Sequence, residues 1–438
     1  MTLHGEPPRL DFWRPVHEAE SQMRKVSSQV GEDFGVFFMA NRRIYLDHSA
    51  TTPVDSRVAA VMTHALTETF GNASSVHGFG QQARAAVDRA RREVASLIDA
   101  RQNEIVFTSG GTEANNLALK GLSHGEAAHL ITSSIEHPSV RGVCEALEQR
   151  GWDVTRLPVY ENGIVRIDDL KAAITARTLL ITIMAANNEI GTLQPIAEIG
   201  KVVAAKRSDG QKIWFHTDAV QAAGRVPINV DELGCDLLSM SGHKLYAPKG
   251  VGALFVRRGV RLQSQSVGGH QERERRAGTE NVPGIVAFGE AARLARKEFS
   301  ERNEHDKQLR DMFEHLVIER IGDVVLNGDR QKRLPHLSNI SFRFIEGEGL
   351  LINLDLQGVA VSTGSACSSG TLEPSPVVRA LGHNDELARG SIRFSFGKDN
   401  SVDDVNYTVE ALTSAVQKLR ELSPLNKPST LELETSRR

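Results

Sequence analysis

Cysteine is scarce in this sequence, which has only Cys144, Cys235 and Cys367 among its 438 residues. An odd and sparse set of thiols does not build a disulfide scaffold and is typical of the reducing cytoplasm. Cys144 and Cys235 fall in apolar segments, so we expect them to fill the core. The sequence also lacks a C-x-x-C pair and an H-E-x-x-H motif, and its histidines are scattered. We therefore predict a cytoplasmic protein without a metal site.

The sequence also lacks a long apolar run and an excess of charge of either sign. No apolar segment is long enough to span a bilayer. The formal net charge is only −3, from 52 basic and 55 acidic residues. This balance argues against nucleic acid or an anionic membrane as a direct partner. The apolar share of 40% and the charged share of 24% are those of an ordinary globular protein.

The length of the chain predicts more than one domain, because a single core rarely grows so large. Residues 1–38 show no regular apolar period, and we interpret them as a disordered extension. We expect a large domain over residues 55–301. A smaller domain would combine residues 39–54 with residues 302–422, and residues 423–438 would form a flexible tail.

Short apolar runs alternate with helical patterns in the first two thirds of the chain, which predicts an α/β fold with a mainly parallel sheet flanked by helices. The expected strands are 104–108, 129–133, 179–185, 213–217, 236–240 and 251–256. The expected helices include 81–98, where apolar residues recur at spacings of three and four, and 113–121.

The order of elements changes beyond about Glu301. A long charged helix is followed there by expected strands near residues 338–344 and 391–395. This pattern indicates a smaller α+β domain.

One lysine and one cysteine occupy positions that suit chemistry. Lys244 follows an apolar run and precedes a Pro-Lys-Gly turn, and burial there would favour the neutral amine that forms imines. Cys367 lies among small residues, over 362–370, that give it almost no apolar neighbour. We expect a thiol that is used in chemistry and can move between sites.

Polar residues follow several expected strands, and each admits an ordinary explanation beside a functional one. The glycine-rich stretch 108–113 could bind a phosphate at a helix start or could simply be a turn. Asp218 could pair with a ring nitrogen of a cofactor or cap the next helix, and Gln221 lies one turn further on the same face. His137 could stack on a planar ring or be a loop residue before proline. Together with residues 187–191, these strand ends predict a ligand site at the carboxyl edge of the sheet.

Arg393 lies within an apolar strand, where an arginine is costly unless it is paired. An internal carboxylate would give Arg393 a structural role. A bidentate clamp on a substrate carboxylate would give it a functional one. The sequence alone leaves both interpretations open.

A set of short motifs spread over most of the chain carries a resemblance to a known family. The motifs are Tyr45-Leu-Asp-His-Ser-Ala-Thr-Thr-Pro53, Asn72-Ala-Ser-Ser-Val-His77, Ser109-Gly-Gly-Thr-Glu-Ala-Asn115, Glu136-His137, Asn187-Asn-Glu-Ile-Gly191, Asp218, Gln221, Ser241-Gly-His-Lys244, Arg275-Arg-Ala-Gly-Thr-Glu-Asn281 and Ser362-Thr-Gly-Ser-Ala-Cys367. This set resembles the class V aminotransferase family and, within it, the cysteine desulfurases of the NifS/IscS group. The resemblance implies the fold type I of enzymes that depend on pyridoxal 5′-phosphate, with a large domain and a smaller α+β domain.

The resemblance implies which residues bind this cofactor. Lys244 would carry it as a Schiff base, Asp218 would pair with its ring nitrogen and His137 would stack on its ring. Gln221 and Asn188 would contact the oxygen side of the ring. The residues that bind the phosphate would be Gly111, Thr112, Ser241, His243 and, from the other subunit of a homodimer, Thr279.

The resemblance also implies the reaction, in which L-cysteine is converted to L-alanine. Arg393 and Asn188 would hold the substrate carboxylate, and the catalytic residues would be Lys244, His137 and Cys367. Cys367 would take the sulfur as a persulfide and pass it to an acceptor or iron–sulfur scaffold protein, for iron–sulfur cluster assembly or thiolation. Two alternatives stay open: a selenocysteine lyase or aminotransferase, which would not need the Cys367 loop, and a non-catalytic partner of a sulfur-transfer complex.

Removal of residues 1–38 is expected to leave folding and activity unchanged, because this stretch has no apolar period and precedes the first strand signal. A protein that starts at Met39 would be compared with the full chain by thermal unfolding and by turnover of cysteine. Precipitation or loss of activity of the shortened protein would contradict the expectation.

Overall fold

The computed structural model describes residues 42–123, 125–363 and 373–424. The elements below belong to one compact unit that begins at Arg43. The predicted extension 1–38 lies outside the described residues, as do Cys367 and most of the predicted tail 423–438. No helix within the described ranges has both the length and the apolar character needed to cross a membrane.

The larger sheet has seven strands in the order β2-β8-β7-β6-β5-β3-β4. Their bounds are β2 Ile105–Thr108, β3 His129–Ser133, β4 Asp153–Leu157, β5 Thr178–Thr182, β6 Trp214–Asp218, β7 Leu237–Ser241 and β8 Gly252–Val256. The strands from β4 through β3, β5 and β6 to β7 pair in parallel. β8 runs antiparallel to both of its neighbours, β7 and β2. The prediction of a mainly parallel sheet is therefore confirmed, and β4 is a strand that the sequence analysis did not identify.

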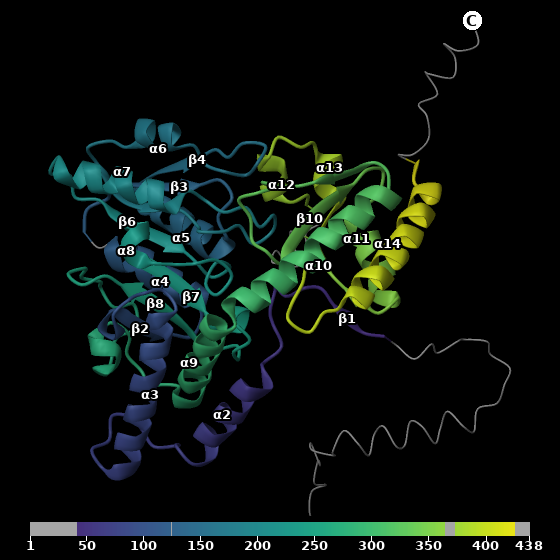
Figure 1. The fold of residues 1–438 in the computed structure, drawn as a ribbon. Coiled ribbons are helices and arrows are strands. Elements are labelled where there is room, and N and C mark those ends of the chain that lie inside the picture. Colours follow the sequence, from purple (N-terminus) through teal and green to yellow (C-terminus); the bar gives the residue numbers. More distant parts are fainter. Residues whose placement is uncertain (1–41, 124, 364–372, 425–438) are drawn as a thin grey trace, which may run out of the picture. The chain divides into compact units, whose positions relative to one another are not determined.

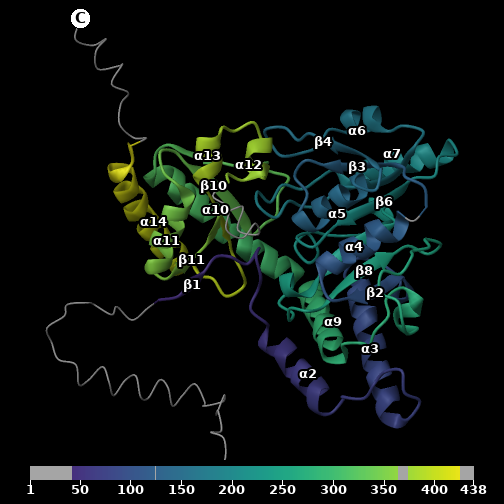
Figure 2. The ribbon, with the colours of Figure 1, turned by 180° about the vertical axis from the view of Figure 1, so that it is seen from behind.

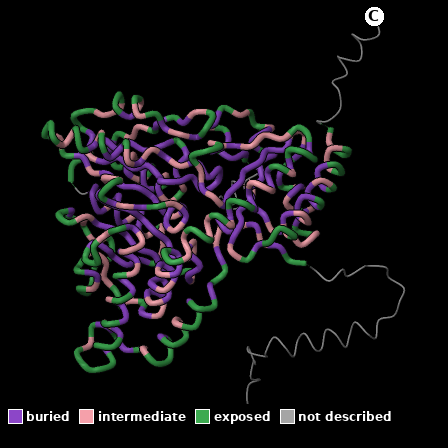
Figure 3. Tube along the Cα trace, viewed as in Figure 1, coloured by how far each residue is buried: buried purple, intermediate pink, exposed green. Residues whose placement is uncertain are grey.

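Helices cover both faces of this sheet (Figure 1). Side chains alternate along each strand, so Ile131 and Phe215 belong to one apolar cluster, whereas Leu130 and Leu180 belong to another. Burial follows the strands and the inner faces of these helices (Figure 3). The helix bounds are α2 Ser56–Thr67, α3 Gly78–Ser96, α4 Gly111–Leu122, α5 Pro138–Glu148, α6 Ile167–Ala173, α7 Ile196–Ser208, α8 Val230–Leu233 and α9 Val282–Lys297. The expected helices 81–98 and 113–121 correspond to α3 and α4.

The register of β2, β8 and β7 decides which turns meet at one edge of the sheet. Gly252 at the start of β8 pairs with Ser241 at the end of β7 and with Thr108 at the end of β2. The turns that follow β2 and β7 therefore begin side by side. A side chain at position 252 would not fit there, because its Cβ would lie 2.6 Å from the Cα of Gly110.

A second sheet has four strands in the order β12-β13-β10-β9 (Figure 2). Apolar side chains beside it form a separate core. The strand bounds are β9 Val324–Leu326, β10 Leu337–Phe342, β12 Ser362–Thr363 and β13 Ser391–Ser395. The fully buried rings of Phe313, Phe342 and Phe394 lie in this core. The helix bounds in this part of the chain are α10 Phe299–Arg320, α11 Gly347–Leu356, α12 Pro376–Ala380, α13 Asp385–Arg389 and α14 Val402–Leu422. Beside this sheet, β1 (Ile44–Tyr45) pairs in parallel with β11 (Val359–Ala360).

Residues 46–52, called here the connecting segment, lead from the smaller core to the carboxyl edge of the larger sheet. Ser49 N donates to Ser395 Oγ over 2.9 Å, which ties the segment to β13. Further along, Thr52 N and Thr52 Oγ1 both donate to the carbonyl oxygen of His243, each at 3.0 Å. The segment is therefore bonded at one end to the small sheet and at the other to the turn that carries Lys244.

Candidate functional site

Lys244 lies directly after β7, in the short 3-10 turn Gly242–Lys244. Its Nζ donates to the carbonyl oxygens of Ser49 and Ala50, at 2.5 and 2.7 Å. Gln221 Nε2 donates to the same Ser49 oxygen at 3.0 Å. Two predicted site residues from different strand ends thus meet at one carbonyl of the connecting segment.

Asp218 is the last residue of β6 and is buried. Its Oδ1 accepts from Val220 N at 2.9 Å, which closes a local turn and caps no helix, because the next described helix begins only at Val230. Its Oδ2 accepts from Asn115 Nδ2 of α4 at 2.7 Å. The carboxylate is therefore fixed by two donors from different elements, and it has lone pairs left for a further donor.

His137 follows β3 and caps the N-terminus of α5. Its Nδ1 accepts from Ser139 N at 3.1 Å and lies 2.8 Å from Ser139 Oγ. The pKa of the imidazole is lowered, chiefly by burial and also by the Lys244 amine, while the Asp218 carboxylate acts in the opposite direction. A neutral ring close to both charges is suited to stacking on a planar ligand.

The glycine-rich turn after β2 leads directly into α4. Gly111 approaches Val220 so closely that a Cβ would lie 2.7 Å from Val220 Cγ2 and 3.6 Å from Ser241 Cβ. Within the described chain, no side chain caps the start of this helix. Its first backbone N–H groups are therefore free to bind an anion next to Ser241.

The carboxylate of Glu113 holds this turn in place through two hydrogen bonds. Glu113 accepts from Ser109 N through Oε2 at 2.8 Å and from Arg276 Nε through Oε1 at 2.8 Å. Thr112 lies exposed at the rim of the turn. His243, on the neighbouring turn, has Nδ1 at 3.1 Å from Thr51 Oγ1, and burial is the main cause that lowers its pKa to about 4.

Arg393 of β13 is buried and has partners within the protein. Its Nη2 donates to Asp47 Oδ1 at 2.8 Å, and its Nη1 donates to the carbonyl oxygen of Asn188 at 2.9 Å. The internal carboxylate of the structural interpretation is therefore present. Arg393 Nε has no hydrogen-bond partner among the described residues, so part of the guanidinium remains unsatisfied.

Glu136 is a buried acid immediately before His137. Its Oε1 accepts from Ser133 Oγ at 2.7 Å and from Met184 N at 2.8 Å, which joins the ends of β3 and β5. Burial raises the pKa of this carboxyl to about 8. Its Oε2 is buried without a hydrogen-bond partner in the described part of the chain.

One predicted site residue in the described chain, Thr279, is not bonded to this group, and another, Cys367, cannot be placed. Thr279 is exposed, and the described chain gives it no hydrogen bond to the other predicted site residues. Cys367 lies outside the described residues. The other two thiols, Cys144 and Cys235, are fully buried as expected, and burial raises the pKa of each to about 12.

Sequence reasoning did not assign roles to several residues that shape this site, namely Asp47, Ser49, Asn115, Glu136 and Ser139. Ser49 acts through its backbone carbonyl, and because every residue has one, the residue type could not indicate this role. Asn115 could have been found, because it follows Gly111 by four residues and therefore lies on the same face of the expected helix.

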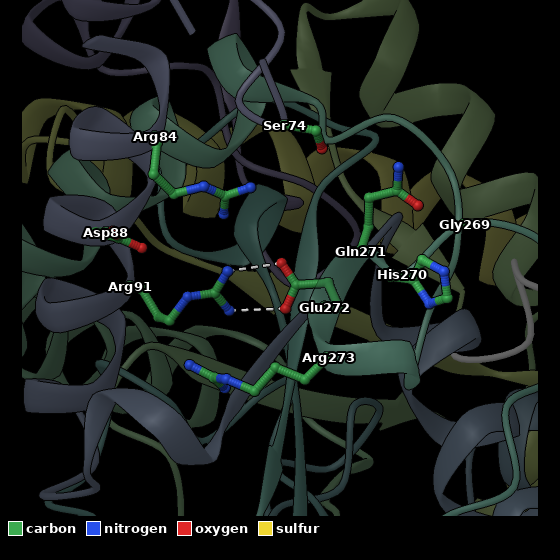
Figure 4. Close-up of a pocket in the computed structure, with 9 residues that line it drawn as sticks. All are labelled: Ser74, Arg84, Asp88, Arg91, Gly269, His270, Gln271, Glu272 and Arg273. Atoms are coloured by element: carbon green, nitrogen blue, oxygen red, sulfur yellow. Dashed lines mark hydrogen bonds and ion pairs between the residues drawn. The ribbon is translucent and has the colours of Figure 1, made fainter. Parts of the chain in front are cut away.

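A cavity of about 470 Å³ lies apart from these residues (Figure 4). Its wall contains the buried ion pair of Arg91 with Glu272, joined by two bonds of 2.7 Å. Arg84, which also lines it, is paired with Glu280 at 2.6 and 2.8 Å. Arg84 and Arg91 are therefore already neutralised, and the cavity contains none of the predicted site residues.

Comparison with known proteins identifies relatives over most of the chain. The family model "Aminotransferase class-V" matches residues 44–408. "Cysteine desulfurase IscS" of Dictyoglomus turgidum is 51% identical over 87% of this chain and 97% of that protein, and the protein of the same name from Methanosarcina thermophila is 49% identical over 88% and 95%. A solved structure described as a NifS-like protein superposes with a TM-score of 0.81 at 34% identity, covering 86% of this chain and 100% of that one.

Glu136→Gln is expected to flatten the dependence of stability on pH. In the wild type, the unfolded carboxyl ionises near pH 4.5 while the folded one stays protonated to about 8, so the free energy of unfolding falls as pH rises through this window. The variant lacks this dependence, and the difference amounts to at most about 1.4 kcal/mol per pH unit. Denaturant unfolding between pH 5 and 8 at fixed protein concentration measures it.

Glu148→Gln on the exposed side of α5 is the matched control. Its carboxyl pairs with Arg156, which lowers its pKa, so its contribution changes only at acid pH. Profiles for wild type and Glu136→Gln that stay parallel from pH 5 to 8 would show that Glu136 is ionised in the folded protein.

Proposed function

This chain belongs to the class-V aminotransferase family, and we propose that it acts as a pyridoxal 5′-phosphate-dependent cysteine desulfurase, which converts L-cysteine to L-alanine and mobilises the sulfur. The predicted family and its fold type I are confirmed by the match over residues 44–408 and by the superposition on a NifS-like protein. The observation that carries the proposal is that Lys244, Asp218 and the start of α4 converge at one sheet edge, in a chain half identical to proteins named cysteine desulfurases.

The family generally depends on pyridoxal 5′-phosphate, and the residues at this edge fit such a group. The uncapped start of α4 and the close approach of Gly111 suit a phosphate, with Thr112, Ser241 and His243 as neighbouring ligands. The amine of Lys244 is the covalent anchor. When bound, the cofactor supplies an electron sink that labilises bonds at the substrate α-carbon.

Residues from three strand ends hold the ring of this cofactor. Asp218 pairs with the ring nitrogen, for which it retains lone pairs beside its bonds to Asn115 and Val220. His137 stacks on the ring as a neutral imidazole, which its lowered pKa supports. Gln221 and Asn188 contact the oxygen side of the ring.

The enzyme acts as a homodimer, and Thr279 of one subunit reaches the phosphate of the other. The exposure of Thr279 and its lack of a bond to the other site residues in the described chain support a role outside its own site. We further propose a cytoplasmic location.

Arg393 and Asn188 bind the carboxylate of L-cysteine. Arg393 already donates to Asp47 and to the Asn188 carbonyl through its two Nη atoms. The substrate carboxylate therefore binds the same guanidinium group on the side of Nε, which has no partner among the described residues. Lys244 takes the proton from the substrate α-carbon.

Cys367 is the sulfur acceptor. Its thiolate attacks the substrate sulfur, the carbon–sulfur bond breaks, and the β-carbon gains a proton to give L-alanine. The new sulfur–sulfur bond leaves a persulfide on Cys367, so the two sulfur atoms are oxidised while the carbon is reduced. The persulfide then passes its outer sulfur to an acceptor or iron–sulfur scaffold protein, for iron–sulfur cluster assembly or thiolation.

Cys367→Ser is expected to retain the cofactor's colour and to lose alanine formation almost completely, because a hydroxyl is a far poorer nucleophile toward sulfur. Alanine and sulfide released from cysteine provide the measurement. Cys144→Ser is the control: this thiol is buried in the core, so its loss affects thermal stability but not turnover. A Cys367→Ser enzyme that forms alanine at the wild-type rate would favour the lyase or aminotransferase alternative.

Arg393→Lys is expected to raise the KM for cysteine by about tenfold, the cost of one charge-assisted hydrogen bond, while cofactor binding is unchanged. Arg379→Lys tests the same change at an exposed pair with Asp385 and should leave KM as it is. Unchanged kinetics for Arg393→Lys, or a protein that does not fold, would assign Arg393 to the structural pair with Asp47 alone.

A further inference from the structure

Asn115 is a buried amide that connects two of the predicted cofactor ligands. It lies on α4, one turn after Gly111, and is fully buried. Its Nδ2 donates to Asp218 Oδ2 at 2.7 Å and to Ser139 Oγ at 2.8 Å. A primary amide has two N–H hydrogens, so both are used in these two bonds.

The directions of these bonds are fixed by their partners. If the amide were turned over, its oxygen would face Asp218 Oδ2, and two acceptors would meet at 2.7 Å. Because Ser139 Oγ accepts from Asn115, its own hydrogen points elsewhere, and His137 Nδ1 lies 2.8 Å away to receive it. A continuous chain of hydrogen bonds thus connects Asp218 to His137 through Asn115, which donates to both of its partners, and Ser139.

Stability alone does not explain an asparagine at this position. Its Oδ1 is buried and has no hydrogen-bond partner in the part of the chain that the structure describes. An unsatisfied buried acceptor is unfavourable, and the neighbours of Asn115 along the inner face of α4 are the apolar residues Ala114, Leu117 and Ala118. What the amide provides is a pair of hydrogen bonds that fix the positions of Asp218 and Ser139.

We propose that Asn115 is a positioning residue that holds the Asp218 carboxylate in the rotamer that meets a ring nitrogen and, through Ser139, keeps the His137 imidazole in register with it. This inference rests on the proposed function, in which both groups contact one cofactor ring. Asp218 comes from β6 and His137 from the turn after β3. Asn115 of α4 connects them through its bonds to Asp218 and to Ser139. With the amide in place, carboxylate and imidazole are set before the cofactor arrives, which avoids ordering them on binding.

The test uses cofactor labelled with ¹⁵N at its ring nitrogen, bound to the full-length protein. The ¹⁵N resonance reports whether this nitrogen carries a proton, and visible circular dichroism of the bound cofactor reports the geometry of the ring. Asn115→Leu keeps the side-chain size and removes both donors. We expect its ring nitrogen to lose protonation, its dichroic band to weaken, and its dissociation constant for pyridoxal phosphate to rise by about tenfold.

Asn116→Ala is the matched control, since Asn116 is the next residue and, among the residues that the structure describes, its Nδ2 donates to the Thr112 carbonyl alone, at 2.9 Å. It should match the wild type in all three measurements. Ser139→Ala breaks the chain on the side of His137 and keeps the bond from Asn115 to Asp218. It should alter the dichroic band while leaving the ring nitrogen protonated, and it tests the inference even if Asn115→Leu does not fold.

The outcomes separate this inference from the proposed function. A wild-type protein that takes up no pyridoxal phosphate overturns both. A wild type that binds the cofactor, together with an Asn115→Leu variant whose ¹⁵N resonance and dichroic band are unchanged, overturns the positioning role alone. A dichroic band of Ser139→Ala identical to that of the wild type overturns the connection to His137.

Discussion

The parallel alignment of neighbouring strands is the constraint on which the candidate site depends. Because β3, β5, β6 and β7 run in the same direction, the residues that follow them reach one edge of the sheet. Buried side chains on both faces fix the register, since a shift of one residue would exchange the two faces of a strand. Asp218, His137 and Lys244 therefore share an edge of the sheet because of the direction and register of the strands that they follow.

The connecting segment supplies the second half of this arrangement. It offers backbone carbonyls to Lys244 and Gln221 while its other end is bonded to β13, which also contains Arg393. Asp47 lies in the same segment and pairs with Arg393. Lys244, the proposed cofactor anchor, and Arg393, the proposed ligand of the substrate carboxylate, are thus both bonded to one short stretch of chain, although they belong to different sheets.

The fold was predictable where it depends on local pattern. Apolar runs identified strands such as β3 and β13 at their observed positions, and they placed Lys244 directly after a strand, as the structure has it. The direction of β8 was not assigned, although the short connection after β7 does not leave room for the crossover helix that a parallel neighbour needs.

The remaining part of the site depends on contacts between distant residues. Asn115 and Asp218 are 103 positions apart, and Arg393 and Asp47 are 346 apart. No spacing rule relates such pairs, so the sequence left both interpretations of Arg393 open. Ser49 acts through a backbone atom that every residue has, and only the folded chain gives that carbonyl its role.

The burial of Cys144 and Cys235 has an analytical consequence. Both thiols are enclosed in the core, and burial raises their pKa values far above neutrality, so neither supplies thiolate to a reagent in the folded protein. Any label that a thiol reagent adds under native conditions therefore lies on Cys367, the remaining cysteine of the sequence. Cys144 and Cys235 therefore need not be substituted before an experiment that measures, by mass, how many sulfur atoms Cys367 has gained.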